Sequence, residues 1–137
     1  MKTKLLSIVL LISMAFIACK KEGPTTTSKS TLEKISGKWK LLSSVQNSFY
    51  SGTSHITTYN GTAADYADFR NDYKVYSFVN NAYDTSAFGL ISETKMYIDT
   101  YSESFEIQKL TDGELKLYRK EIFSSGDYDE STINFAR

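Results

Sequence analysis

The chain of 137 residues contains one cysteine, one proline, one histidine and one tryptophan. Its single cysteine, Cys19, cannot close an intramolecular disulfide, which excludes the stapled framework of many small exported domains. Proline is restricted to Pro24, and the region from Gly37 onward has none. The one strongly apolar run, Leu5 to Ile17, is shorter than the roughly 20 residues of a membrane-spanning helix. An ordinary helical membrane protein is therefore not expected.

An excess of charge of one sign is also missing, since 16 basic residues balance 16 acidic residues. Removal of residues 1–18 would take away Lys2 and Lys4 and leave 14 basic against 16 acidic residues. A nucleic-acid-binding protein normally carries a basic patch, whereas the lysines here are scattered. We therefore expect no nucleic-acid partner.

The N-terminal segment has the layout of a secretory signal, with Lys2 and Lys4, then the apolar run, then the small residue Ala18. Phe16-Ile17-Ala18-Cys19 resembles a bacterial lipobox, with phenylalanine where leucine is commonest. The resemblance implies that residues 1–18 are a lipoprotein signal peptide, that Cys19 is acylated, and that the exported protein is anchored to a membrane of the cell envelope, expected to be the outer membrane. A plain secretory signal cleaved nearby and an uncleaved signal anchor are the alternatives.

Residues 19–30 contain almost nothing apolar and are predicted to form a flexible tether, because such a stretch cannot offset its ordering entropy. Lys20-Lys21-Glu22 could instead act as a membrane-sorting signal. Order is expected to begin at Ser30, where Ser30 and Glu33 fit a capping box for a short helix over roughly 31–36. Gly37 suits the left-handed position that ends a helix.

From Gly37 onward, apolar and polar residues alternate, which predicts β-strands. Trp39, Leu41, Ser43 and Val45 are expected to share one strand face. Turn-forming residues recur every ten to thirteen positions, which favours antiparallel hairpins in sequence order. The expected strands cover roughly 38–46, 54–59, 65–70, 74–80, 83–91, 94–99, 103–110 and 114–123, with 128–136 as a ninth or closing strand. Large open sheets tend to close, so the sequence predicts an all-β, up-and-down antiparallel barrel of about eight strands.

Thr62 to Asp65 also fits a helix cap, so residues 61–70 could form a helix rather than a strand. The strand from about Asp65 to Arg70 is the favoured alternative.

A short helical turn followed by Gly37-Lys38-Trp39 and a run of antiparallel strands resembles the G-x-W start of lipocalins. The stretch from Asp65 to Tyr76 and the later hairpin from Lys109 to Leu115 resemble the small lipocalin-like domains found on bacterial lipoproteins, and the resemblance covers about residues 31–137. It implies that Gly37 and Trp39 close one barrel end, with Arg137 or Arg119 against the indole, and that the barrel binds a small apolar or amphipathic molecule.

Catalysis and metal binding have little support in the sequence. A Ser-His-Asp arrangement would have to use His55, and its neighbour Ser54 would face the opposite side of a strand. Asp127, Asp129 and Glu130 lack the spacing of a calcium loop and are predicted to be a solvated hairpin tip. We expect neither an enzyme nor a metal site, and no cofactor.

Tyrosine is the most abundant aromatic residue, with ten copies. Seven of them cluster in the central half of the chain, namely Tyr59, Tyr66, Tyr73, Tyr76, Tyr83, Tyr97 and Tyr101. Tyrosine can line a pocket, stack on a sugar or pack on a strand, and Tyr66, Tyr76 and Tyr97 are the candidate pocket or surface aromatics. Two hypotheses follow for an expected monomer: a ligand-binding barrel, or a filled barrel that acts as a protein- or glycan-interaction module.

Overall fold

The computed structural model of the protein describes residues 29–99, 103–123 and 126–137. The predicted signal peptide, Cys19 and most of the predicted tether lie outside these residues. The first described element is the helix α2 (Thr31–Ile35), and its capping box is formed as predicted. The Ser30 side chain accepts a hydrogen bond from the Glu33 backbone N–H, and the Glu33 carboxylate accepts from the Ser30 N–H at 2.7 Å.

Nine antiparallel strands follow, at the positions that the alternation predicts. They are β1 (Gly37–Tyr50), β2 (Thr53–Asn60), β3 (Tyr66–Phe69), β4 (Lys74–Val79), β5 (Ala82–Ser92), β6 (Lys95–Ile98), β7 (Glu103–Leu110), β8 (Glu114–Ile122) and β9 (Tyr128–Ala136). The uncertain segment 61–70 is a loop followed by the short strand β3, so the strand alternative is confirmed.

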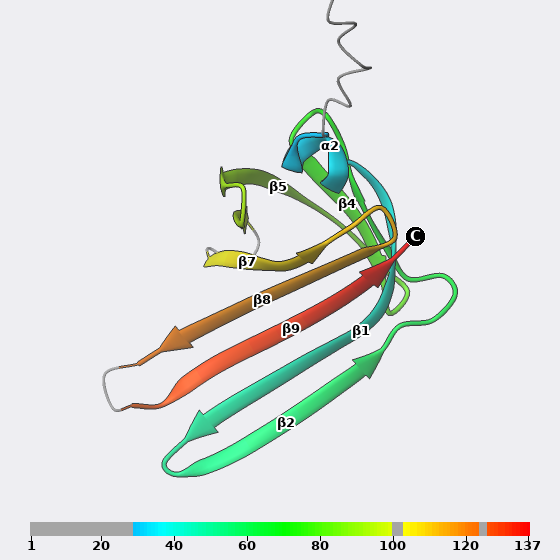
Figure 1. The fold of residues 1–137 in the computed structure, drawn as a ribbon. Coiled ribbons are helices and arrows are strands. Elements are labelled where there is room, and N and C mark those ends of the chain that lie inside the picture. The colour runs from blue at the N-terminus through cyan, green and yellow to red at the C-terminus, as the bar shows by residue number, and fades with distance from the viewer. Residues whose placement is uncertain (1–28, 100–102, 124–125) are drawn as a thin grey trace, which may run out of the picture.

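Eight strands form a closed antiparallel barrel, as predicted, and β2 is an extra strand outside the ring (Figure 1). The ring runs from β1 through β3 and the later strands to β9, which pairs with β1 again. The prediction that β2 belongs to the ring and joins β3 as a hairpin is wrong. Strand β1 is long enough to pair twice along one edge, with β3 through residues 37–40 and with β2 through residues 43–50.

A β-bulge in β1 separates the two pairings. Leu41 lies opposite Phe135 and Ser43 opposite Asn134, so Leu42 is the extra residue. The bulge inverts the alternation of the strand. As a result Ser44 follows Leu41 on the inner side of the barrel, and the prediction that Ser43 and Val45 share the Trp39 face is wrong.

Beyond the bulge, β2, β1, β9 and β8 continue as a four-stranded sheet that extends away from the helix end of the barrel (Figure 1). We call this part the projecting sheet. The large buried side chains lie in the other half of the molecule, close to α2. They include Ile35, Trp39, Phe88, Met96, Phe105 and Leu115, each 0 or 1% exposed. One end of the barrel is therefore filled.

Candidate functional site

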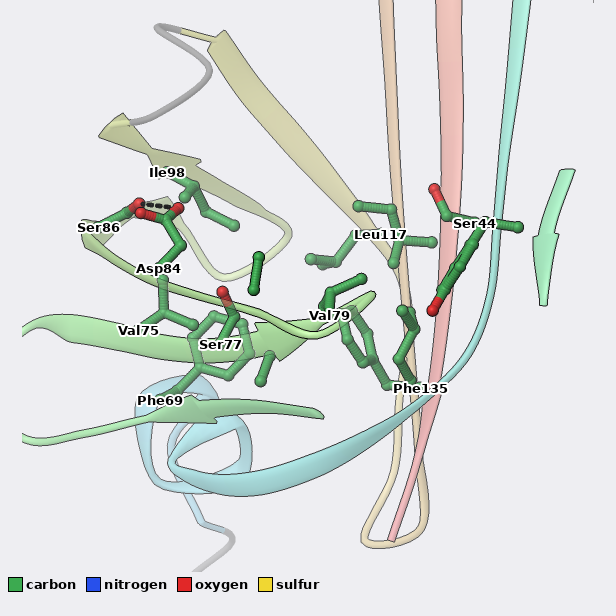
Figure 2. Close-up of a pocket in the computed structure, with 15 residues that line it drawn as sticks. Ser44, Phe69, Val75, Ser77, Val79, Asp84, Ser86, Ile98, Leu117 and Phe135 are labelled. Atoms are coloured by element: carbon green, nitrogen blue, oxygen red, sulfur yellow. Dashed lines mark hydrogen bonds between the residues drawn. The ribbon is translucent and has the colours of Figure 1, made fainter. Parts of the chain in front are cut away.

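The other half of the barrel contains a cavity of about 360 Å³ (Figure 2). Most of its wall is apolar, and side chains from β1 to β6, β8 and β9 contribute to it. The lining residues are Leu41, Ser44, Tyr59, Ala67, Phe69, Val75, Ser77, Val79, Ala82, Asp84, Ser86, Ile98, Leu117, Ile133 and Phe135. Ligand pockets in proteins begin at roughly 300 Å³, so the space is large enough for a small molecule.

Small side chains at inward positions create this space. In β4 the inward positions alternate as Val75, Ser77 and Val79, so a serine stands at the centre of the strand. Its cross-strand neighbour on β3 is Ala67, which also faces the cavity. Trp39 and Met96 are among the inward residues near α2, whereas the lining of the cavity includes Ser44, Ala67, Ser77, Ala82 and Ser86 beside Phe69 and Phe135. The barrel is consequently filled at one end and hollow at the other.

The polar groups of the cavity lie mainly on β5. Among the described lining residues, Asp84 is the only one with a charged side chain, and it is exposed, which places it at the mouth. The Ser86 hydroxyl donates a hydrogen bond of 3.2 Å to Asp84 Oδ2, as Figure 2 shows. Ser86 itself is buried at 7% exposure. A carboxylate with a buried hydroxyl beside it thus faces the apolar space.

Tyr59 is held at the cavity wall by Asp65, which lies just before β3. Its hydroxyl donates to Asp65 Oδ2 at 2.8 Å, and this bond is the main cause that raises the pKa of Tyr59 above its ordinary value. Asp65 also accepts from the backbone N–H groups of Thr62 at 2.6 Å and Asn80 at 3.0 Å. These bonds, with the Thr62 bond first and the Tyr59 bond second, lower the pKa of Asp65 to about 2. Asp65 is a buried carboxylate that ties the start of β3 to β2 and to the β4–β5 turn.

The inner face of the barrel continues onto the projecting sheet and becomes polar there. The row next to Ser44, Ile133 and Leu117 consists of Gln46, Ser131 and Arg119, and the following row consists of Ser48, Asp129 and Glu121. The Arg119 guanidinium lies 5.9 Å from the ring centroid of the buried Phe105, and Tyr50 donates a hydrogen bond of 2.7 Å to Asp129. The apolar wall therefore gives way to charged and hydroxyl groups along one continuous face.

Gly37 and Trp39 lie at the filled end, away from the cavity. The Trp39 Nε1–H donates to the Ile35 carbonyl at 2.7 Å, which joins β1 to α2. The Arg137 guanidinium stacks on the Trp39 ring, 3.8 Å from its centroid, and donates to the carbonyls of Ile35 and Ser36. Gly37 has φ +112°, and a Cβ there would lie 3.3 Å from the Arg137 side chain. Of the two arginines that the resemblance suggested, Arg137 is the one on the tryptophan.

Tyr66, Tyr76 and Tyr97 lie on the outer face, because their neighbours in the strands line the cavity or the core. The Lys38 Nζ lies 3.6 Å from the ring centroid of Tyr66, and the Arg70 guanidinium lies 4.1 Å from that of Tyr76. Tyr97 is 43% exposed. The tyrosine at the cavity is Tyr59, which the sequence marks only as one of a cluster.

The residues considered for catalysis or metal binding do not converge. His55 is exposed on β2. Asp129 and Glu130 are consecutive in β9 and face opposite sides, where Asp129 accepts from Tyr50 and Glu130 accepts from Asn47 at 3.1 Å. Within the described ranges, no group of three histidine, cysteine or acidic side chains is arranged to hold a metal ion.

The membrane predictions fall outside the described part of the chain, since Cys19 precedes residue 29. Among the described helices, none has the length and apolar character needed to cross a bilayer. Comparison of the chain with protein-family models, curated proteins and solved structures finds no match.

Proposed function

We propose that this protein binds a small apolar or amphipathic molecule in the cavity of its barrel. The observation that carries the proposal is the apolar space of about 360 Å³ beside a filled barrel end. An eight-stranded barrel can hold one small ligand, and this binding mode is the one that the resemblance to lipocalins implies. If each heavy atom takes the roughly 30 Å³ that one molecule occupies in liquid water, the space suits a molecule of roughly a dozen heavy atoms.

The test is direct binding of decanol, a neutral ten-carbon amphiphile, to the full chain carrying Cys19→Ser. Native mass spectrometry should show one bound decanol, and calorimetry should give its Kd. Ser77→Phe places a phenyl ring in the cavity and should weaken binding by about tenfold or more. The matched control is Thr85→Phe, because Thr85 is exposed on the outer face of the neighbouring strand β5.

Equal loss of binding in both phenylalanine variants would contradict binding in the cavity. Absence of decanol binding to the parent chain, repeated with envelope lipid extract, would contradict the proposed function itself.

We also propose that the protein is a lipoprotein whose barrel is tethered to a bacterial envelope membrane through acylated Cys19. The lipobox-like Phe16 to Cys19 and the polar stretch after it support this proposal. A multiply acylated terminus anchors stably, because each buried CH₂ contributes about 0.8 kcal/mol. Cys19→Ser should move the protein from the membrane fraction to the soluble fraction, and retention in the membrane fraction would contradict lipidation.

A second candidate function is that of a protein-interaction module, and the feature that favours it is the edge strand β2. This strand ends the sheet order, carries no lysine, glutamate or proline, and exposes Ile56 at 68%. Such an edge can accept an extended segment of another protein. A photocrosslinking residue at Ile56 should then capture one envelope protein, while the same residue at Tyr83, which is 79% exposed, should not. Equal capture at the two positions would contradict this function.

A further inference from the structure

The arrangement of polarity in the cavity bears on the chemical class of the ligand. The apolar side chains line the interior, and the charged group lies at the mouth, so the site is polar at one end only. Asp84 and Ser86 share a hydrogen bond at this end, and a ligand with a donor group can add a charge-assisted hydrogen bond to the Asp84 carboxylate that a plain hydrocarbon cannot make. The site therefore favours a molecule with an apolar tail and a polar head over a plain hydrocarbon.

The charge at the mouth then selects the head group. Asp84 lines the cavity from β5, and the buried Ser86 hydroxyl supports its carboxylate through the 3.2 Å hydrogen bond. A carboxylate accepts hydrogen bonds and attracts positive charge, whereas it repels a second carboxylate or a phosphate. The remaining polar lining groups are the hydroxyls of Ser44, Ser77 and Tyr59, which carry no positive charge.

Arg119 is an inward-facing cation, and a cation at this position could instead attract an anionic head group. Its guanidinium lies over the Phe105 ring, and it belongs to the row of the projecting sheet just beyond the lining residues. On the same inner face it is accompanied by Asp129 and Glu121, two carboxylates in the next row. Arg119 therefore lies beside two carboxylates outside the cavity lining, whereas Asp84 itself lines the cavity.

We propose that the cavity takes a cationic amphiphile, a primary amine on an alkyl chain of about ten carbons, with its ammonium group hydrogen-bonded to Asp84 at the mouth. This inference rests on the proposed function and adds the ligand class to it. The alkyl chain lies among Phe69, Val75, Leu117 and Phe135, and the ammonium donates to the carboxylate. Charge-assisted hydrogen bonds of this kind are the stronger ones.

The test compares decylamine, decanol and decanoate, which differ in the head group alone, on the full chain carrying Cys19→Ser at pH 7. Calorimetry below the aggregation concentration of each compound gives the three Kd values. Decylamine should bind about tenfold more tightly than decanol, and decanoate more weakly than decanol. Asp84→Asn should remove most of the decylamine preference, measured as the ratio of the decanol Kd to the decylamine Kd.

Asp112→Asn is the matched control, because it removes one carboxylate from the exposed turn between β7 and β8, outside the cavity lining. Equal weakening of decylamine by Asp84→Asn and Asp112→Asn would show a general charge effect and overturn the assignment to Asp84. Tighter binding of decanoate, abolished by Arg119→Gln, would overturn the proposal and assign the head group to the projecting sheet. Equal binding of all three compounds would overturn it too while leaving the cavity function intact, whereas no binding of any compound would contradict the function itself.

Discussion

At the scale of single residues, Asp65 has the clearest physical consequence. It is 2% exposed, and its two carboxylate oxygens accept three hydrogen bonds from Thr62, Tyr59 and Asn80. A buried carboxylate is tolerated when its oxygens are satisfied, and hydrogen bonds to the charged form favour that form. Asp65 thereby holds the cavity residue Tyr59 in place from outside the cavity.

Asp65 should make the stability of the fold depend on pH in the acid range. Its pKa of about 2 lies below the ordinary value of 3.8, so its ionised form stabilises the folded state. This contribution is complete above about pH 4, which is the ordinary range of the group, and is lost as the pH falls toward 2. Thermal melts between pH 2 and pH 6 should show the melting temperature falling through this window.

Asp65→Asn should lower the melting temperature at pH 7 and flatten its fall between pH 4 and pH 2. Asparagine replaces one of the two acceptor oxygens with an NH₂ group. This group would face donors that now bond to the carboxylate, either Asn80 on one oxygen or Thr62 and Tyr59 on the other. Asp112→Asn, which changes an exposed carboxylate in a turn, should leave both the melting temperature and its pH dependence unchanged. An unaltered acid profile in Asp65→Asn would contradict the role given to this residue.

At the scale of elements, the distinctive feature is the passage from β2 to β3. Both strands pair with the same edge of β1, so the chain must leave β2 and rejoin that edge at the bulge. The Gly61 N–H donates to the Leu42 carbonyl at 2.9 Å, and a Cβ on Gly61 would lie 2.1 Å from the Leu41 carbonyl oxygen. Glycine is required because two backbone segments meet closely here.

Gly61→Ala should therefore lower the free energy of unfolding by about 1 to 3 kcal/mol, the usual cost of forcing extra atoms into a packed site. Urea denaturation followed by tryptophan fluorescence measures this change, since Trp39 is buried in the barrel. Gly113→Ala is the matched control, because no atom lies within 4 Å of its added Cβ. Equal stability of the two variants would mean that the close contact at Gly61 is relieved without cost.

The elements were largely predictable, and their partners were not. Alternation of apolar and polar residues around Trp39 and Phe105 indicates strands from local chemistry. Asn80 and Asn81 indicate a hairpin turn, and both asparagines indeed have positive φ. Alternation does not reveal which edge a strand pairs with, so the sequence alone predicts β2 as a member of the ring. The bulge at Leu42 inverts the faces of β1 without any proline or glycine to signal it.

The cavity was equally hard to predict from the sequence. Its wall depends on small residues such as Ser77 at alternate positions, which in the sequence look like ordinary strand residues. Asp84 could have been noticed as an acidic residue at an inward position, but which positions face inward depends on the register. Arg137 was suggested by the resemblance alone, because its contact with Trp39 joins positions that are distant in the sequence.

At the scale of the whole molecule, this contact joins the beginning and the end of the described barrel. Arg137 follows β9, and it stacks on Trp39 in β1 while bonding the carbonyls at the end of α2. A guanidinium over an indole contributes roughly 0.5 to 2 kcal/mol, and its two carbonyl bonds add to this value. The contact reinforces the closure of the ring at the filled end.

Arg137→Ala should reduce the free energy of unfolding by about 1 to 3 kcal/mol, measured by urea denaturation. Arg137→Lys should recover part of the loss, since an ammonium can stack on the indole but lacks the planar fork. As a control, Arg70→Ala removes a cation that also lies over an aromatic ring but that pairs with the Asp68 carboxylate at the surface instead of bonding helix-end carbonyls, and it should cost less than about 1 kcal/mol. A loss in Arg137→Ala no larger than in the control would contradict the role of Arg137 in closing the barrel.

The position of β2 outside the ring has a consequence for engineering this protein. Strands β3 and β9 complete the ring on the two sides of β1. The turn at Ser51 and Gly52 joins β1 to β2, and β2 is not one of the ring strands. Gly52 has no atom within 4 Å of an added Cβ, and the turn stands at the far tip of the projecting sheet. A peptide tag or a fluorescent label inserted between these two residues would lie outside the ring, at the end of β2 opposite to the cavity residue Tyr59.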